Sequence, residues 1–220
     1  MQAYKTQFLE LALEIGVLRF GQFELKSGRI SPYFFDAGLF NTGYAAAKLG
    51  RCYASAVAEL DIEFDMLFGP AYKGIGLVAL TAASLAERYD LDYPFAYNRK
   101  EAKDHGEGGS GIGAPIEGRV IILDDVITAG TAIREATSII RSAGAEPAGA
   151  LVALDREEIG SRSRVSAIRE LQDALGIPIR SIVSLGDLVD HLEEDSEFVE
   201  YLPAVRAYRN RYGVALEHSG

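Results

Sequence analysis

The sequence predicts an α/β protein, with a twisted, mostly parallel sheet, helices on both faces and a small N-terminal hood. The first observation behind this prediction is that apolar runs alternate with helical patterns through the middle of the chain. The second is the run Val120–Leu123, whose four apolar residues include three β-branched ones, as is typical of a strand buried on both faces. The 220 residues, 48% hydrophobic and 25% charged, suit a single domain spanning 1–220.

Residues 1–40 are expected to form most of the hood. Apolar residues at helical spacing from Tyr4 to Ile15 predict an amphipathic helix that ends at Gly16. Val17–Leu25 then predicts a hairpin arm with its turn near Gly21. Residues that favour turns follow at Ser27, Gly28, Ser31 and Pro32.

The rest of the chain predicts alternating strands and helices. The expected strands are Phe64–Phe68, Tyr93–Tyr97, Val120–Leu123, Ala148–Leu154 and Ile179–Leu185. The expected helices are Ala45–Leu60, Ile75–Leu85, Ile133–Ala143, Val165–Leu175, Asp187–Glu194 and Ser196–Tyr212. Residues 187–220 contain no pattern that indicates chemistry.

Composition limits the class of function. A net charge of −10 and a pI of about 4.9 argue against a general nucleic-acid-binding surface. The single cysteine, Cys52, excludes an internal disulfide and a Cys-based zinc site, and we expect it to be a small core residue. No apolar run approaches the ~20 residues of a membrane span. Glu10 and Glu14 interrupt any signal-peptide core, so we expect a cytoplasmic protein without a membrane partner.

The stretch from Val120 to Ala132, V-I-I-L-D-D-V-I-T-A-G-T-A, carries the strongest chemical signal. A strand runs into Asp124 and Asp125, and a small Thr/Gly loop then leads into a helix. Such a loop can direct backbone N–H groups at a phosphate, and the start of the helix favours an anion. The two acids suit hydroxyls, a metal or a developing positive charge, as a ribose 5-phosphate would offer. The alternative is that the acids merely cap the helix.

A second strand–glycine–helix junction, G-P-A-Y-K-G-I-G, follows the strand that ends at Phe68. It predicts another anion site, to which Lys73 adds a positive charge. Its second half also matches the dinucleotide pattern G-x-G-x-x-A. That pattern requires an acid at the end of the next strand, whereas Asp90 and Asp92 precede that strand, so dinucleotide binding is disfavoured.

Residues 98–115 form the least foldable stretch, with five glycines and many charges. Its first half carries four groups that are or can become cationic, namely Arg99, Lys100, Lys103 and His105. A long loop of this kind is typically a lid, a binding loop or a disordered segment. Taken alone, it would more often be a solvated surface loop.

The Val120–Ala132 stretch resembles the phosphoribosyl pyrophosphate (PRPP) motif of type I phosphoribosyltransferases. The string L-K-S-G-R-x-S-P-Y-F-F-D, which ends at Asp36, resembles the N-terminal signature of orotate phosphoribosyltransferases. The resemblance implies a PRPP site made of Lys26, Tyr72, Lys73, Arg99, Lys100, Lys103, His105, Asp124, Asp125, Val126, Ile127, Thr128, Ala129, Gly130, Thr131 and Ala132. It implies an orotate site made of Lys26, Phe34, Phe35, Thr128 and Arg156.

The implied reaction transfers the 5-phosphoribosyl group from PRPP to orotate, giving orotidine 5-monophosphate and pyrophosphate. The implied catalytic residues are Lys100, Lys103, His105, Asp124 and Asp125. Mg²⁺ is the expected cofactor, held mainly by PRPP oxygens and water rather than by a protein metal site. Residues 98–115 would be a mobile catalytic loop that closes over a neighbouring subunit, which implies a homodimer.

Two alternatives stay open on the sequence. One is a phosphoribosyltransferase for another base, against which the signature from Lys26 to Asp36 argues. The other is a regulator that binds PRPP without catalysis. A regulator that binds nucleic acid would need a basic surface, and the acidic balance of this chain argues against it.

Overall fold

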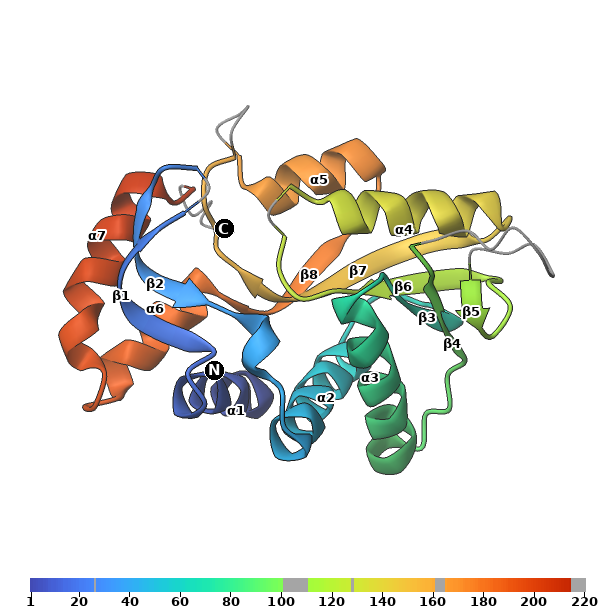
Figure 1. The fold of residues 1–220 in the computed structure, drawn as a ribbon, viewed down its shortest axis with the longest axis horizontal. Coiled ribbons are helices and arrows are strands. Elements are labelled where there is room, and N and C mark those ends of the chain that lie inside the picture. The colour runs from blue at the N-terminus through green and yellow to red at the C-terminus, as the bar shows by residue number, and fades with distance from the viewer. Residues whose placement is uncertain (26, 101–110, 128, 161–164, 215–220) are drawn as a thin grey trace.

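The computed structural model describes residues 1–25, 27–100, 111–127, 129–160 and 165–214. Within these residues a six-stranded sheet carries helices on both faces, and a two-stranded hairpin lies at one end (Figure 1). The predicted fold class, with its mostly parallel sheet and N-terminal hood, is confirmed.

The sheet has the strand order β5-β4-β3-β6-β7-β8. Its strands are β3 (Met66–Gly69), β4 (Phe95–Asn98), β5 (Gly111–Gly113), β6 (Arg119–Leu123), β7 (Glu146–Asp155) and β8 (Ile179–Ser184). Neighbouring strands are parallel except β5, which runs antiparallel along β4. Every residue of β3 is buried, as the apolar sequence of a two-sided parallel strand requires.

Helices form a layer on each side of the sheet. The helices α1 (Ala3–Glu14), α2 (Gly43–Ala58) and α3 (Lys73–Tyr89) lie below it in Figure 1. The helices α4 (Thr131–Ser142) and α5 (Ala167–Leu175) lie above it, while α6 (Leu185–Glu194) and α7 (Leu202–Tyr212) flank the hairpin. Short 3₁₀ turns occupy Ala37–Leu39 and Val199–Tyr201.

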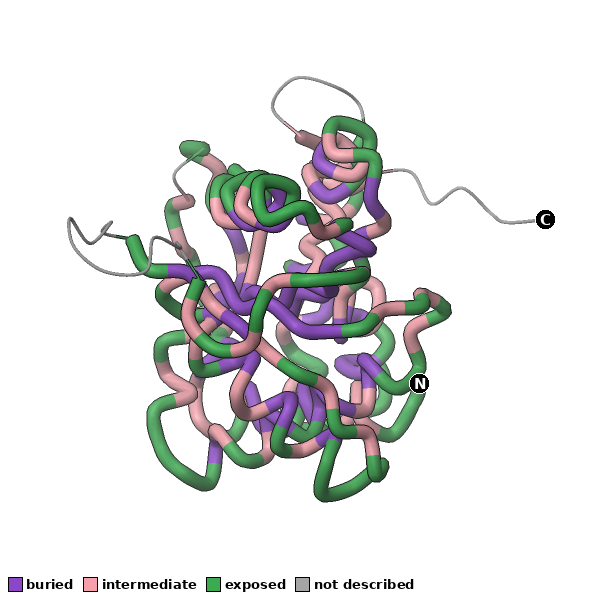
Figure 2. The backbone as a smooth tube through the Cα atoms, turned by 90° about the vertical axis from the view of Figure 1, so that its right-hand side faces the viewer, coloured by how far each residue is buried: buried purple, intermediate pink, exposed green. Residues whose placement is uncertain are grey.

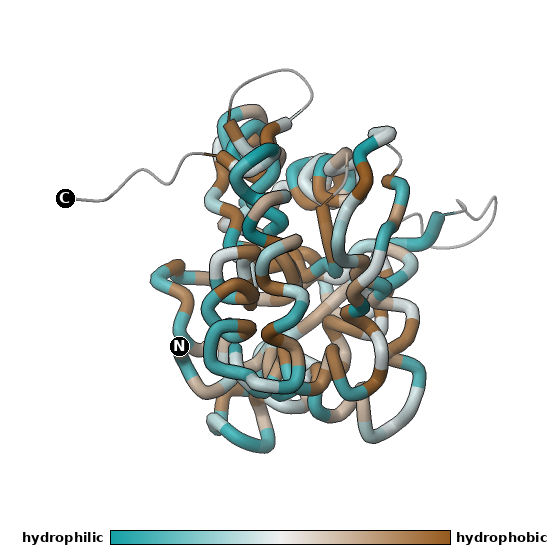
Figure 3. Tube along the Cα trace, turned by 90° about the vertical axis from the view of Figure 1, so that its left-hand side faces the viewer, coloured by the Kyte–Doolittle hydropathy of each residue, from teal (hydrophilic) through white to brown (hydrophobic). Residues whose placement is uncertain are grey.

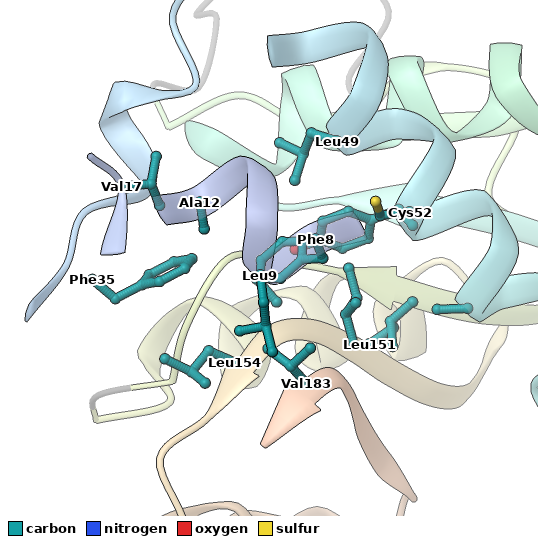
Figure 4. Packing of buried hydrophobic residues seen from close by; sticks show 14 of the residues in the cluster. Phe8, Leu9, Ala12, Val17, Phe35, Leu49, Cys52, Leu151, Leu154 and Val183 are labelled. Atoms are coloured by element: carbon teal, nitrogen blue, oxygen red, sulfur yellow. The ribbon is translucent and has the colours of Figure 1, made fainter. Parts of the chain in front are cut away.

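Two hydrophobic cores follow from this layering, one on each face of the sheet. Figure 2 shows the buried residues concentrated along the inner strands, and Figure 3 shows hydrophilic residues gathered at the outer turns. In the larger core, Phe8 of α1 packs against Phe35 of the hairpin with ring centroids 6.1 Å apart (Figure 4). The hood therefore shares a core with the sheet.

The order of the strands creates an expected ligand-binding position at one edge of the sheet. Helix α3 carries the chain from β3 to β4 on one side, whereas β6 lies on the other side of β3. The connections that leave β3 and β6 consequently diverge at the carboxyl ends of these strands. Open α/β sheets bind their ligands at such a switch point.

The hairpin corrects two details of the prediction. Strand β1 (Leu18–Glu24) pairs antiparallel with β2 (Ile30–Phe35), and the turn lies between Leu25 and Arg29 rather than near Gly21. Gly21 instead occupies an irregularity in the register of β1. Ser31 and Pro32, expected in a turn, belong to β2.

Other differences are smaller. The expected loop 98–115 contains the short strand β5, because Gly111–Gly113 pairs with the end of β4. The expected closing helix begins only at Leu202, after a 3₁₀ turn. The other predicted helices and strands are present with their ends shifted by a few residues.

Candidate active site

The acidic pair, Asp124 and Asp125, directly follows β6, and each residue is 8% exposed. The backbone N–H of Asp124 donates to the Leu151 carbonyl at 3.1 Å, and the Ala153 N–H donates to the Asp125 carbonyl at 2.7 Å. These hydrogen bonds continue the pairing with β7 past the end of β6. The pair is therefore fixed at the carboxyl edge of the sheet.

The helix below the sheet also holds this turn. The hydroxyl of Tyr53, a fully buried residue of α2, donates to the Asp124 carbonyl at 2.7 Å. The backbone N–H of Asp125 donates to Asp124 Oδ1 at 3.0 Å. The Tyr53 contact could not be predicted, because the position of Tyr53 on an apolar stripe indicates only a core residue.

Burial changes the acidity of the first acid. Desolvation raises the pKa of the Asp124 carboxyl to about 7, and the neighbouring charge of Asp125 acts in the same direction. The Asp125 N–H and Lys73 oppose this rise. Asp124 consequently changes its charge near neutral pH.

The structure brings the two predicted anion loops together. Lys73, the first residue of α3, follows the loop after β3, and its Nζ lies 2.5 Å from Asp125 Oδ2. The Lys73 side chain is 55% exposed, so it can leave the carboxylate for another anion. This ion pair joins the loops after β3 and β6 at the switch point of the sheet.

The loop after β3 needs glycine for steric reasons. A Cβ at Gly69 would lie 2.0 Å from the carbonyl oxygen of Gly74, and a Cβ at Gly74 would lie 2.6 Å from Pro70. The side chain of Asn98, at the end of β4, accepts the Ala71 N–H at 2.7 Å. The backbone of this loop is therefore packed against itself and against the neighbouring strand.

The start of residues 98–115 lies beside that loop. Tyr72, which follows a cis Ala71–Tyr72 peptide bond, is 67% exposed. The Nζ of Lys100 lies 5.0 Å from the centre of its ring. Arg99 follows β4 directly and is exposed. Two of the predicted cationic residues thus lie close to the loop that carries Lys73.

The Thr/Gly loop leads into α4 as predicted. Gly130 has a φ of 70°, and a Cβ there would lie 2.8 Å from Leu171 of α5. Val126 still pairs with Leu154, while Ala129 and Thr131 are exposed. The remaining described residues, Ile127 and Ala132, are half-buried. The first N–H groups of α4 have no partner within the helix and can serve an anion.

Arg156 lies one residue beyond β7, at the same edge of the sheet. Its guanidinium carbon lies 4.5 Å from the ring centre of Tyr33 in the hood. Its Nε donates to Glu158 Oε1 at 2.7 Å, and its Nη2 donates to Ser31 Oγ at 3.2 Å. The hood and Glu158 thus both hold the guanidinium of Arg156 in place.

The two phenylalanines predicted for the base site point to opposite sides of β2. Phe35 is buried against Phe8, so its ring belongs to the core and only its backbone is available to a ligand. The half-buried Phe34 ring lies 5.4 Å from the ring of Phe23. Of these two residues, Phe34 alone can therefore offer the face of its ring to a ligand. Lys26, Lys103, His105 and Thr128 lie outside the described residues.

The geometry also decides against dinucleotide binding. The residue at the carboxyl end of the strand after the glycine loop is Asn98, not an acid. Asp90 caps the far end of α3, away from the loop.

A hollow of about 570 Å³ beside Leu60, Arg119 and Pro178 lies at the opposite edge of the sheet, where β6 begins.

Comparisons with known proteins agree with this arrangement. A profile for the phosphoribosyl transferase domain matches residues 39–174. The curated orotate phosphoribosyltransferase of Pseudomonas aeruginosa is 59% identical over 214 residues, which cover 97% of this chain and 100% of the relative. The chain belongs to the orotate phosphoribosyltransferase family.

Other orotate phosphoribosyltransferases show the same likeness. The curated relative from Thioalkalivibrio sulfidiphilus is 60% identical, with 97% of this chain and 100% of the relative covered. The crystal structure of the Francisella tularensis enzyme is 40% identical and superposes with a TM-score of 0.82, covering 94% of this chain and 98% of that one. The predicted resemblance to orotate phosphoribosyltransferases is confirmed.

Two further observations bear on the partners of an orotate phosphoribosyltransferase. Among the described residues, no group of three or more His, Cys, Asp or Glu side chains could hold a metal ion. None of the described helices has the length and apolarity needed to cross a membrane.

Proposed function

We propose that this protein transfers the 5-phosphoribosyl group from PRPP to orotate, giving orotidine 5-monophosphate and pyrophosphate in pyrimidine biosynthesis. The family membership of the whole chain supports the reaction. The observation that carries the site is the Lys73–Asp125 ion pair, which puts a mobile cation and the acidic pair at one switch point. PRPP needs both, because it presents pyrophosphate and ribose hydroxyls close together.

The ribose 5-phosphate would lie over the loop from Val126 to Ala132. Backbone N–H groups at the start of α4 and the hydroxyls of Thr128 and Thr131 would hold the phosphate. Asp124 and Asp125 would accept the ribose hydroxyls and stabilise positive charge on the ring. Anchored in this way, the ribose presents C1 to the incoming base.

The leaving pyrophosphate would be held by cations. When the bond between C1 and the pyrophosphate oxygen breaks, the electron pair stays on pyrophosphate and the ribose resembles an oxocarbenium ion. We propose that the negative charge on the leaving pyrophosphate is stabilised by the Tyr72 hydroxyl and by the cationic groups of Lys73, Arg99, Lys100, Lys103 and His105. Closure of residues 98–115 would exclude water from the reactive ion.

The base would enter from the hood side. Arg156 would pair with the orotate carboxylate, a partner that suits a guanidinium. Phe34 and the Phe35 backbone would border the flat ring, and Lys26 and Thr128 would complete the contacts. N1 of orotate then bonds to C1 and its proton passes to solvent, and no residue is assigned as a dedicated general base.

Mg²⁺ fits this site as a substrate-borne ion. The acidic pair offers two carboxylates, and Mg²⁺ in phosphate sites typically takes one or two carboxylates together with substrate oxygens and water. When bound, the ion would neutralise charge on the leaving pyrophosphate.

We further propose that the protein is a cytoplasmic enzyme. We also propose that it forms a homodimer in which residues 98–115 of one subunit close over the site of the other.

The test is a panel of bases. Purified protein is mixed with PRPP, Mg²⁺ and orotate, and the loss of orotate's ultraviolet absorbance is followed, with uracil, hypoxanthine and adenine as parallel bases. Turnover with orotate alone is the expected result. Turnover with another base would assign a different phosphoribosyltransferase. Binding of PRPP without turnover of any base would favour a regulator.

A further inference from the structure

The guanidinium of Arg156 is held along one edge. Its Nε and Nη2 both lie 2.7 Å from Glu158 Oε1, and its plane lies near the ring of Tyr33. Its Nη2 also donates to Ser31 Oγ at 3.2 Å, and the Tyr208 hydroxyl is a further hydrogen-bonding neighbour of the group. The hydrogen bonds of Nε and Nη2 thus fix the orientation in which the guanidinium can meet a ligand.

Glu158 connects Arg156 to two other parts of the fold. The hydroxyl of Tyr208, in α7, donates to Glu158 Oε1 at 2.9 Å. Arg29, in the hairpin turn, donates from Nη1 to Glu158 Oε2 at 3.1 Å. The Glu158 side chain is only 14% exposed, so these charge-assisted hydrogen bonds are shielded from water.

The guanidiniums of Arg29 and Arg156 both contact one carboxylate, that of Glu158, whereas the nearby Asp155 carboxyl accepts the Glu157 N–H at 2.8 Å. The adjacent carboxylate of Glu157 is engaged elsewhere, since it accepts the Gly186 N–H at 2.9 Å and lies 3.4 Å from Arg209. The cluster is therefore suited to one further anionic group.

The C-terminal segment also fixes the backbone beneath this cluster. The Ile159 N–H donates to the Tyr212 carbonyl at 2.8 Å, and the Val214 N–H donates to the Glu157 carbonyl at 2.9 Å. Residues 157–159 are thus held by the end of α7 through the backbone, and by Tyr208 through a side chain. Helix α7, in which the sequence indicated no chemistry, adjoins the base side of the site.

We propose that Glu158, held by Tyr208 of α7, is a positioning residue that fixes Arg156 for the carboxylate of the pyrimidine. This inference rests on the proposed function. A free arginine would lose rotamer freedom when it binds the substrate, whereas an arginine already held by Glu158 has lost that freedom on folding. The effect should therefore concern the base and not PRPP.

The test compares Michaelis constants for the two substrates. Glu158→Gln keeps the size of the side chain and removes the charge that orients Arg156. We expect KM for orotate to rise about tenfold, with kcat and KM for PRPP within about twofold of the unaltered protein. Tyr208→Phe removes one hydroxyl and keeps the ring packing, so KM for orotate should rise about threefold.

Two variants serve as matched controls. Glu157→Gln changes the neighbouring carboxylate, which contacts Arg209 and not Arg156. Tyr89→Phe removes a hydroxyl that donates to Ser55 at 2.8 Å, on a different helix pair. Both should leave KM for orotate within about twofold.

The outcomes separate the two claims. An unchanged KM for orotate in Glu158→Gln, or an equal rise in both Michaelis constants, would make Glu158 a structural residue only. Tyr208→Phe decides the question if Glu158→Gln does not fold. Absence of any orotate-dependent pyrophosphate release by the unaltered protein would overturn the proposed function, and this inference with it.

Discussion

At the scale of single residues, the site combines two buried carboxylates with an exposed lysine. The sequence indicated Asp124, Asp125 and Lys73, because their residue types follow strands and precede helices. It did not indicate Tyr53, Asn98 or Glu158, which form hydrogen bonds between distant segments. A polar residue at the carboxyl end of a strand is a signal that could have identified Asn98.

Asp124→Asn should stabilise the ligand-free protein at pH 8. The folded pKa of about 7 lies above the ordinary value of 3.8, so the folded state binds the proton more tightly than the unfolded state. Stability therefore falls as pH rises from about 4 to about 7, as the buried carboxyl becomes charged. The neutral amide avoids that charge, so its stabilising effect should be roughly 1–3 kcal/mol larger at pH 8 than at pH 5.

Urea unfolding at the two pH values measures this difference. Asp173→Asn is the control, because Asp173 is an exposed carboxylate paired with Arg169. Its effect should be small and similar at both pH values. A gain for Asp124→Asn that is equal at pH 5 and pH 8 would show that the charge of Asp124 is not the cause.

At the scale of elements, hydrophobic periodicity predicted the strands and helices well. A strand buried on both faces, such as β6, requires apolar residues along its length. The hairpin turn was predicted at the wrong position because a glycine such as Gly21 suits a β-bulge as well as a turn. Strand β5 was missed because the two glycines of Gly111–Gly113 disfavour a strand, which forms here by pairing with β4.

Gly69→Ala should disrupt the junction between β3 and α3. The new Cβ would lie 2.0 Å from the Gly74 carbonyl oxygen, so the backbone itself would have to move. We expect the free energy of unfolding to fall by about 2–4 kcal/mol.

Gly76→Ala is the matched control on the same element. No atom lies within 4 Å of the added Cβ at this position inside α3, so stability should rise by about 0.5–1 kcal/mol. Chemical denaturation gives both values. Equal effects of the two substitutions would contradict the steric account of this junction.

At the scale of the whole molecule, the arrangement of the strands brings together residues that are far apart in the sequence. Phe35 of the hood and Phe8 of α1 share one core, and Arg156 meets the hood through Tyr33. The sequence predicted such a hood only in outline, because packing between distant segments leaves no periodic signal.

The proposal that the site is shared between two subunits predicts complementation. Lys103→Ala removes a proposed loop cation, and Asp125→Asn alters the acidic pair, so each variant alone should lose about 10²–10³ in turnover. Mixed and allowed to exchange subunits, they should recover about a quarter of the unaltered activity, because half of the dimers then contain one intact site. Mixtures that stay inactive, although native mass spectrometry shows mixed dimers, would place each loop over its own subunit.

The most direct measurement of the central claim is phosphorus NMR of the reaction itself. Protein, Mg²⁺, PRPP and orotate are mixed, and the phosphorus signals are followed with time. We predict that PRPP is replaced by pyrophosphate and one new monophosphate ester in equal amounts, and only when orotate is present. Persistence of PRPP, or its decay to ribose 5-phosphate at a rate that does not depend on orotate, would contradict phosphoribosyl transfer at this site.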